Sequence, residues 1–97
     1  MAIYVTLINF TEQGIKNIKE SPQRVAAARQ AIEAAGGKML GFYWTLGQYD
    51  AIAIGEAPSD EVYTAIILAI AGQGNIRSTT LKAFNEAEIG RVIANMP

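Results

Sequence analysis

Four stretches of the sequence have the pattern of β-strands, because they are rich in β-branched and aromatic side chains and end at turn-forming residues. We expect strands over residues 2–10, 38–46, 49–57 and 77–84. In the first stretch, apolar side chains occupy both alternating sets, which are Ile3, Val5, Leu7 and Tyr4, Ile8, Phe10. Successive side chains of a strand point to opposite faces of the sheet. The first strand should therefore be covered on both faces.

Helical patterns separate these strands. Residues 11–20 are mostly polar and predict no more than one or two helical turns. A longer helix should begin at Ser21, whose hydroxyl can cap a free backbone N–H group, with Pro22 suited to the first helical position. It should end near Ala35, because the following pair of glycines tolerates the left-handed conformation that stops helices.

A second helix should follow residues 58–61, where two acids complement the positive end of the helix dipole. Its apolar stripe consists of Val62, Ile66, Ala69 and Ile70, and the apolar surface continues through Ile67, Leu68 and Ala71. No charged face remains, and a helix that is apolar all round is normally buried on several sides. We therefore expect residues 62–71 to form a subunit contact or the wall of a pocket.

The order of these elements predicts the fold. Gly47 and Gln48 should form a tight two-residue connection, which makes the second and third strands antiparallel. Residues 85–88 resemble a capping box that begins a short C-terminal helix reaching about Asn95. The resulting order, β-α-β-β-α-β with a trailing helix, is the ferredoxin-like arrangement. We predict an α+β fold with a four-stranded antiparallel sheet and helices on one face.

The chain is too apolar for the surface of a small monomer. Hydrophobic residues make up 51% of its 97 residues and charged residues 18%, below the share of about a quarter that is typical of soluble domains. This length fits one domain over residues 1–97, with a large surface for its volume. We expect the excess apolar surface to line a cavity or to pair two sheets in a barrel-like homodimer or higher homo-oligomer.

Charge and residue content exclude several classes of function. The net charge of -1, the pI of about 5.3 and the scattered basic residues argue against a nucleic-acid partner. Without Cys or His, the sequence supports no metal site and no thiolate nucleophile, and we assign no cofactor. The N-terminal residues do not resemble a signal peptide, and the longest uncharged run, residues 62–76, is too short to span a membrane. We expect a cytoplasmic protein.

The most distinctive stretch is residues 42–50, which holds half of the chain's aromatic residues and ends on Asp50. Asp50 is the only charged residue between Lys38 and Glu56. Two hypotheses remain open for it. Its carboxylate either anchors the turn by accepting backbone N–H groups, or it is a catalytic group in a pocket, with a pKa raised by apolar neighbours.

Other residues complete the candidate ligand site around Asp50. They are Tyr43, Trp44, Tyr49, Lys16 and Arg77. Tyr43 and Trp44 are adjacent on a strand and point to opposite faces, so only one of them can share a face with a given ligand. Lys16 could guide an acidic ligand, and Arg77 follows a glycine-containing loop, residues 72–75, that could bind an anion. A solvated surface and simple helix termination are the alternative explanations for Lys16 and for this loop.

Several blocks of the sequence resemble the GYD domain family, in the same order along the chain. They are residues 11–19, 21–22, 42–50, 74–80 and 83–84. The family takes its name from a Gly-x-Tyr-Asp signature, present here as Gly47, Tyr49 and Asp50. The resemblance covers essentially the whole chain. It implies the fold of the dimeric α+β barrels, which include small cofactor-independent monooxygenases and other small-molecule enzymes.

Three functions remain open. The leading hypothesis is an oligomer that binds a small apolar or aromatic molecule in a pocket between sheet and helices, lined by Tyr43, Trp44, Tyr49 and Asp50. The second is a cofactor-independent enzyme, of monooxygenase or isomerase type, in which Asp50 or a tyrosine transfers a proton. The third is an interaction module that assembles with other proteins through the uncharged helix at residues 62–71.

Overall fold

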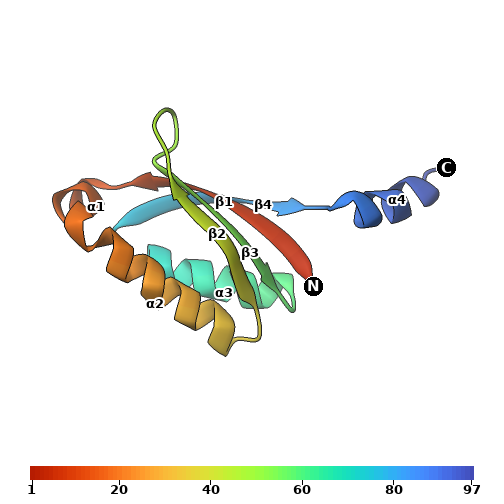
Figure 1. Ribbon diagram of the computed structural model, residues 1–97, viewed down its shortest axis with the longest axis horizontal. Coiled ribbons are helices and arrows are strands. Elements are labelled where there is room, and N and C mark those ends of the chain that lie inside the picture. The colour runs from red at the N-terminus through yellow and green to blue at the C-terminus, as the bar shows by residue number, and fades with distance from the viewer.

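The computed structural model describes residues 1–97 and has the predicted βαββαβ order followed by a helix (Figure 1). Its elements are β1 (Ala2–Phe10), α1 (Glu12–Lys16), the 3₁₀ turn η1 (Ile18–Glu20), α2 (Ser21–Ala34), β2 (Lys38–Trp44), β3 (Ala51–Ala57), α3 (Asp60–Ala71), β4 (Ile76–Ala83) and α4 (Glu86–Ala94). The strands form one antiparallel sheet in the order β2-β3-β1-β4. The ferredoxin-like α+β fold is confirmed. None of the helices combines the length and the hydropathy needed to cross a membrane.

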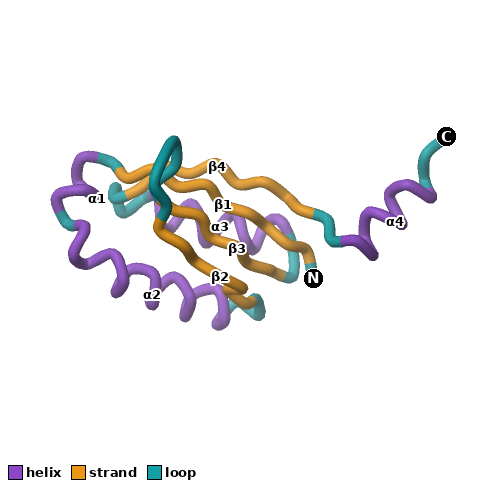
Figure 2. The backbone as a smooth tube through the Cα atoms, turned by 45° about the horizontal axis from the view of Figure 1, so that its top comes forward, coloured by secondary structure: helices purple, strands orange, loops and turns teal.

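Helices α2 and α3 cover one face of the sheet (Figure 2). The buried residues of β1 and β3 lie on this face, where the register pairs Tyr4 with Gly55, Thr6 with Ala53 and Ile8 with Ala51. The large side chains therefore come from β1, and β3 contributes only small ones. Short side chains on β3 leave space beneath the two helices, because nothing from this strand reaches up to fill it.

The opposite face of the sheet carries no helix (Figures 1 and 2). Val5 and Leu7 of β1 lie on this bare face, where their neighbours on β3 are Ile54 and Ile52 and Val5 also pairs with Leu81 of β4. All of these side chains remain partly exposed, and Leu81 exposes 50% of its surface. The predicted second apolar face of the first strand is thus present, but a single chain leaves it uncovered.

Helix α4 projects away from the sheet and the other helices (Figure 1). With α4 included, the longest dimension of the molecule is 50 Å. It begins with the predicted capping box, in which the Asn85 side chain accepts the Glu88 N–H at 2.8 Å and the Glu88 side chain accepts the Asn85 N–H at 3.0 Å. Its apolar stripe consists of Ile89, Val92 and Ile93 and is continued by Met96 just after the helix; these side chains are between 42% and 68% exposed. Helix α4 therefore presents an amphipathic surface that its own chain does not bury.

Two local predictions were wrong. Ser21 does not cap α2, because η1 runs directly into the helix and the Ser21 hydroxyl instead accepts the Trp44 indole N–H at 2.9 Å. The connection between β2 and β3 is not a two-residue turn but a longer loop, residues 45–50, closed by the Thr45 N–H donating to the Asp50 carbonyl at 2.9 Å. In both places, a partner distant in the sequence changed the local structure.

Candidate functional site

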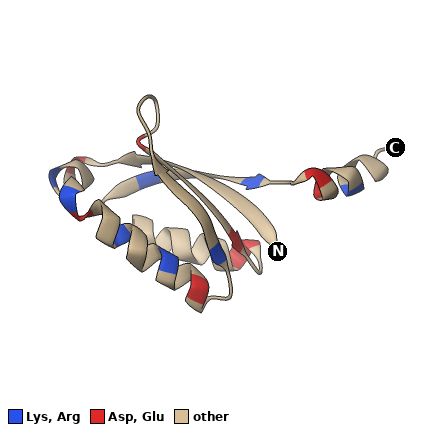
Figure 3. Cartoon of the chain, viewed as in Figure 1, with Lys and Arg blue, Asp and Glu red and all other residues tan.

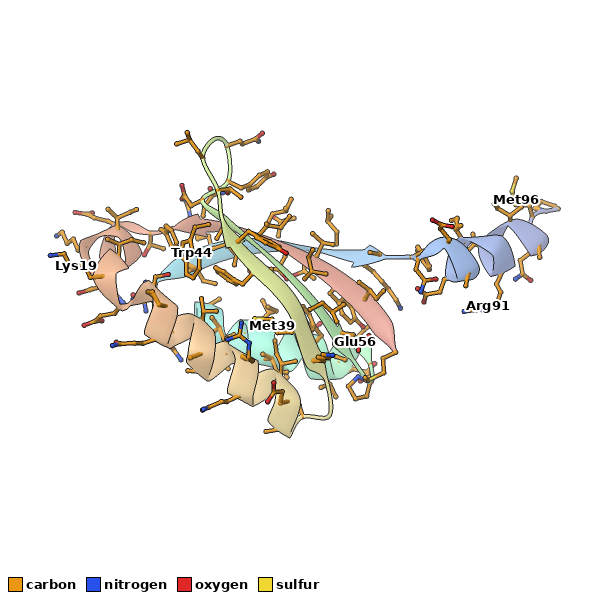
Figure 4. The ribbon with its side chains drawn as sticks, viewed as in Figure 1. Lys19, Met39, Trp44, Glu56, Arg91 and Met96 are labelled. Carbon is orange, nitrogen blue, oxygen red and sulfur yellow. The ribbon has the colours of Figure 1, made fainter.

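A large apolar cavity lies between α2, α3 and the covered face of the sheet. Its volume is about 570 Å³, and 17 of the 24 residues that line it are hydrophobic. Helix α2 contributes Ala27, Ala28 and Ala31 to the wall, and β3 contributes Ala53. Because these side chains are short, helix and sheet do not fill the space between them. Met39 of β2, labelled in Figure 4, also lines the cavity.

The polar residues of the lining gather at one end of the cavity. Six of the seven come from segments 20–24 and 73–75, and they are Glu20, Ser21, Gln23, Arg24, Gln73 and Asn75. Helix α1 lies at this end, because the Gln13 side-chain amide donates to the Gln73 carbonyl and to the Asn75 side chain, both at 3.0 Å. The cavity is therefore polar at the α1 end and apolar over the rest of its length.

Tyr63 of α3 supplies a buried hydroxyl to the apolar part of the cavity. The residue is 2% exposed, and its ring stacks on Tyr4 with the centroids 4.3 Å apart. Its hydroxyl lies 2.8 Å from that of Thr6, which lies 3.2 Å from that of Thr80. Burial raises the pKa of Tyr63, so the hydroxyl stays protonated at neutral pH and can donate a hydrogen bond. Tyr63 and Thr6 both line the cavity.

A second polar group joins α3 to the sheet. Asp60, the first residue of α3, accepts a hydrogen bond from the Tyr4 hydroxyl and forms an ion pair with Lys82 Nζ at 3.0 Å. Burial, assisted by the hydrogen bond to Asp60, raises the pKa of Tyr4 to about 12. The hydrogen bonds from Tyr4 and Lys82 lower the pKa of Asp60. At neutral pH, both groups keep the protonation states that hold them together, so this contact is a structural link and not a proton relay.

Tyr63 is not among the residues predicted from the sequence, although its position on α3 gave a signal. Tyr63 precedes Ile66, Ile67 and Ile70 by three, four and seven residues, which places all four on one side of α3. The predicted stripe began one residue earlier, at Val62. Val62 does pack against the core, and Ile66, Ala69 and Ile70 line the cavity, so the predicted stripe left out Tyr63 but was otherwise correct. The omission arose because the helix is apolar on several sides, so periodicity alone does not select the face that meets the sheet.

Asp50 ties the loop between β2 and β3 to the end of β1. Its Oδ2 accepts the Phe10 backbone N–H at 2.9 Å, and its own N–H donates to the Ile8 carbonyl at 2.8 Å. Gly47, earlier in the same loop, has a φ of 137°, a conformation that favours glycine. This geometry supports the turn-anchor hypothesis, and Asp50 is not among the residues that line the cavity.

The three aromatic candidates lie on different surfaces. Tyr43 is on the bare face of the sheet and is 59% exposed. Trp44, labelled in Figure 4, is on the other face, where its indole N–H bonds to Ser21 and its ring packs edge-on against Phe42 with the centroids 4.8 Å apart. Tyr49 lines a separate recess of about 230 Å³ beside the loop. The predicted opposition of Tyr43 and Trp44 is correct, but the structure does not bring the three rings together.

Lys16 and Arg77 also lie outside the lining of the cavity. Lys16 is exposed on α1 and forms an ion pair with Glu12 at 3.4 Å. Arg77 is exposed on β4, opposite Asn9 on the bare face. Tyr43, Trp44, Tyr49 and Asp50 are likewise not among the residues that line this cavity. A role in ligand binding for any of the six sequence-derived residues stays a prediction.

Charged residues are spread over several elements of the chain (Figure 3). No three Asp or Glu residues are close enough together to hold a metal ion. The cavity, with its hydroxyls and its polar end, is therefore the feature of the chain whose geometry best suits a ligand.

Solved structures from several proteins share this fold. FFRP-DM1 has a TM-score of 0.61 at 17% sequence identity, covering 87% of this chain and 100% of that one. TTHA0845 from Thermus thermophilus has a TM-score of 0.55 at 23% identity, covering 88% of this chain and 95% of that one. A MhuD mutant with two manganese protoporphyrin IX molecules bound per active site has a TM-score of 0.50 at 16% identity, covering 89% of this chain and 95% of that one. These likenesses place the chain among the ferredoxin-like folds of dimeric α+β barrel type and show the fold alone.

Two further comparisons concern the sequence. The "Glutamine synthetase and cystathionine beta-lyase binding protein" of Thermus thermophilus is 26% identical over 90 residues, which cover 92% of this chain and 95% of that protein. The model of the GYD domain matches residues 4–93, a span that includes the signature residues Gly47, Tyr49 and Asp50. Because this match extends over nearly the whole sequence, the chain belongs to the GYD domain family.

Proposed function

We propose that this protein is a homodimer in which each protomer binds a small, mostly apolar molecule in the cavity between α2, α3 and the sheet. The observation that carries the proposal is the cavity itself, with a volume of about 570 Å³ and a mainly hydrophobic lining. Pockets for small molecules typically have volumes of about 300–1,000 Å³ and similar walls with a few polar groups. An aliphatic or planar aromatic molecule is the ligand that such a space favours.

The bare face of the sheet supports the homodimer. Val5 and Leu7 on the central strand β1 and Leu81 on the neighbouring edge strand β4 have no covering helix, although the chain is 51% hydrophobic. Two such sheets can pack face to face about 10 Å apart and bury these side chains against each other. Packing of this kind leaves α2, α3 and the cavity on the outside of the dimer, where a ligand can reach them.

Filling the cavity from α2 tests the proposal. Ala28 lines the cavity, whereas Ala26, two residues earlier on the same helix, is exposed and lies outside the lining. We expect Ala28→Phe to reduce the affinity for the neutral apolar dye Nile red at least tenfold, because the ring occupies the ligand's space. Ala26→Phe places the same ring on the solvent-exposed side of α2 and should leave the affinity for the dye unchanged. Fluorescence titration measures both variants.

Two results would contradict the cavity as the binding site. One is equal dye affinity in Ala28→Phe and Ala26→Phe, which would locate binding on another surface. The other is an absence of saturable binding in the unmodified protein. The melting temperature of each variant, followed by circular dichroism, shows that a loss of binding does not come from unfolding.

A second candidate function is binding to other proteins. The relative from Thermus thermophilus is named as a binding protein for two enzymes, and it matches over nearly the whole length of both chains. The exposed apolar stripe of α4 supports this candidate, because amphipathic helices with a free apolar face commonly dock into grooves of partners. Helix α3 also exposes Leu68, at 67%, within the uncharged segment that the sequence singled out. Small-molecule binding and partner binding use different surfaces and are compatible in one protein.

A further inference from the structure

We infer that the ligand of the cavity carries a single carboxylate, and that Arg24 binds this carboxylate at the polar end. The inference rests on the proposed function and adds the chemical class of the ligand and its orientation. It depends on the hydrogen bonding of Arg24, on the distribution of polar residues along the cavity, and on the charges that surround that end.

The guanidinium of Arg24 has too few partners. Arg24 lies on α2 in the wall of the cavity, and its Nη1 donates to the Asn17 carbonyl at 3.0 Å. Its Nη2 is buried and has no hydrogen-bond partner. No acid forms an ion pair with it, because the two ion pairs of the chain involve Lys16 and Lys82. A buried charged donor without an acceptor is costly, so this group calls for a partner that the protein itself does not provide.

The cavity determines where such a partner lies. Apart from Thr6, the polar lining residues are confined to segments 20–24 and 73–75, and Arg24 is the only cation in the lining. The remainder is apolar and leads away from Arg24 between α2 and α3. Only one hydrogen bond, from Nη1 to the Asn17 carbonyl, holds the guanidinium. Rotation about the side-chain torsions of Arg24 can therefore turn Nη2 toward a ligand in the cavity. A ligand with an apolar body and one anionic end fits this arrangement lengthwise.

The local charge favours a monocarboxylate over a phosphate. Glu20, one helical turn before Arg24, also lines this end and is the only acid in the lining. Each negative charge on a ligand is repelled by Glu20 as well as attracted by Arg24, so a second charge on the ligand adds repulsion while the guanidinium is already paired with the first. The planar fork of a guanidinium matches a carboxylate through two parallel hydrogen bonds. The geometry therefore points to acids such as fatty acids or aryl-alkanoic acids.

A pair of matched ligands tests the inference. We expect 4-phenylbutanoate to bind the unmodified protein about tenfold more tightly than its neutral counterpart 4-phenylbutanol, measured by isothermal titration calorimetry, because only the acid pairs with Arg24. Arg24→Gln should remove this preference and leave the affinity for the alcohol unchanged. Arg29→Gln makes the same charge change on the exposed side of α2, outside the lining, and should keep the preference.

The outcomes separate this inference from the proposed function. If acid and alcohol bind the unmodified protein equally, the Arg24 site is wrong and the apolar cavity stands. If Arg29→Gln abolishes the preference as fully as Arg24→Gln, the effect is one of net charge, and the inference is again overturned. If neither compound binds and Nile red also fails to bind, the proposed function itself is wrong. If Arg24→Gln does not fold, Arg24→Lys replaces it in the test, because lysine keeps the positive charge but lacks the planar guanidinium. A preference for 4-phenylbutanoate over 4-phenylbutanol that is smaller than in the unmodified protein, but still present, then supports the inference.

Discussion

Asp50 illustrates how a signature residue can serve the fold. Its carboxylate accepts the Phe10 N–H, and its backbone pairs with Ile8 and Thr45, so three segments meet at this one residue. An unsatisfied backbone N–H in a partly buried place costs free energy, and a carboxylate acceptor removes that cost with a charge-assisted hydrogen bond. These hydrogen bonds support the hypothesis that Asp50 anchors the loop at residues 45–50.

Two substitutions at Asp50 separate an anchor from a catalytic group. Asp50→Ala removes the acceptor and should lower the free energy of unfolding by about 1–3 kcal/mol, because the Phe10 N–H loses its partner. Asp50→Asn keeps an acceptor oxygen, so it should lower the free energy of unfolding by less than Asp50→Ala does, and it should not change the ligand affinity. Urea unfolding and the Nile red titration measure the two quantities. Equal stability of all three proteins, together with lost ligand binding in Asp50→Asn, would restore the pocket hypothesis.

Residues of the site could be predicted from the sequence only where the signal is local. Asp50 and Gly47 stand out because they follow a run of aromatic residues and belong to a turn. Tyr63 and Arg24 do not, because their importance comes from distant partners. Tyr63 on α3 contacts Thr6 and Tyr4 of β1, and Arg24 lies in a wall completed by α3. Spacing along one helix does not reveal which residues face it from elsewhere in the fold.

At the scale of elements, α4 was predicted almost to the residue because its capping box is a contact between Asn85 and Glu88, close in the sequence. The direction in which α4 points was not predictable. It depends on which surface its apolar stripe meets, and the stripe is exposed and packs on no other element of its own chain. The error at residues 45–50 has the same origin, since bonds to β1 determine the length of the loop.

Helix α4 provides a test of the protein-binding candidate. We expect the double substitution of Ile89 and Ile93 by lysine to leave the melting temperature and Nile red binding unchanged, because both side chains are exposed, at 42% and 57%. The same substitution should abolish co-sedimentation with purified glutamine synthetase, measured by analytical ultracentrifugation. Ala87→Lys adds a charge on the same helix outside the stripe and serves as the control. Failure of the unmodified protein to sediment with either glutamine synthetase or cystathionine beta-lyase would count against this candidate.

At the scale of the whole molecule, the chain has one covered and one bare sheet face. The two apolar faces of β1 followed from its alternating side chains, because this alternation depends only on the geometry of a strand. The antiparallel sheet with helices on one face followed from the order of the elements along the chain. The volume and lining of the cavity did not follow, since they depend on how far α2 and α3 stand from the sheet. Periodicity identifies which side of a strand is apolar, but not how tightly the layers pack.

The bare face predicts the oligomeric state. Leu81 lies on edge strand β4 and is half exposed, so Leu81→Lys should be tolerated within one chain. In a dimer, the same charge would be buried between two sheets, and we expect the protein to become monomeric. Light scattering coupled to gel filtration measures the mass, with Thr64→Lys on the exposed side of α3 as the control. A monomeric unmodified protein would contradict the proposed pairing.

The row of alanines on α2 gives the cavity an adjustable size. Alanine, leucine and methionine are all good helix formers, so a change among them at residues 27, 28 or 31 alters the bulk of the wall and not the stability of the helix backbone. The sheet, the caps and the loop anchor lie elsewhere and need not respond. A change of a few carbon atoms in these side chains is enough to lengthen or shorten the cavity and so to select ligands of different length. The same fold can in this way accommodate different ligands.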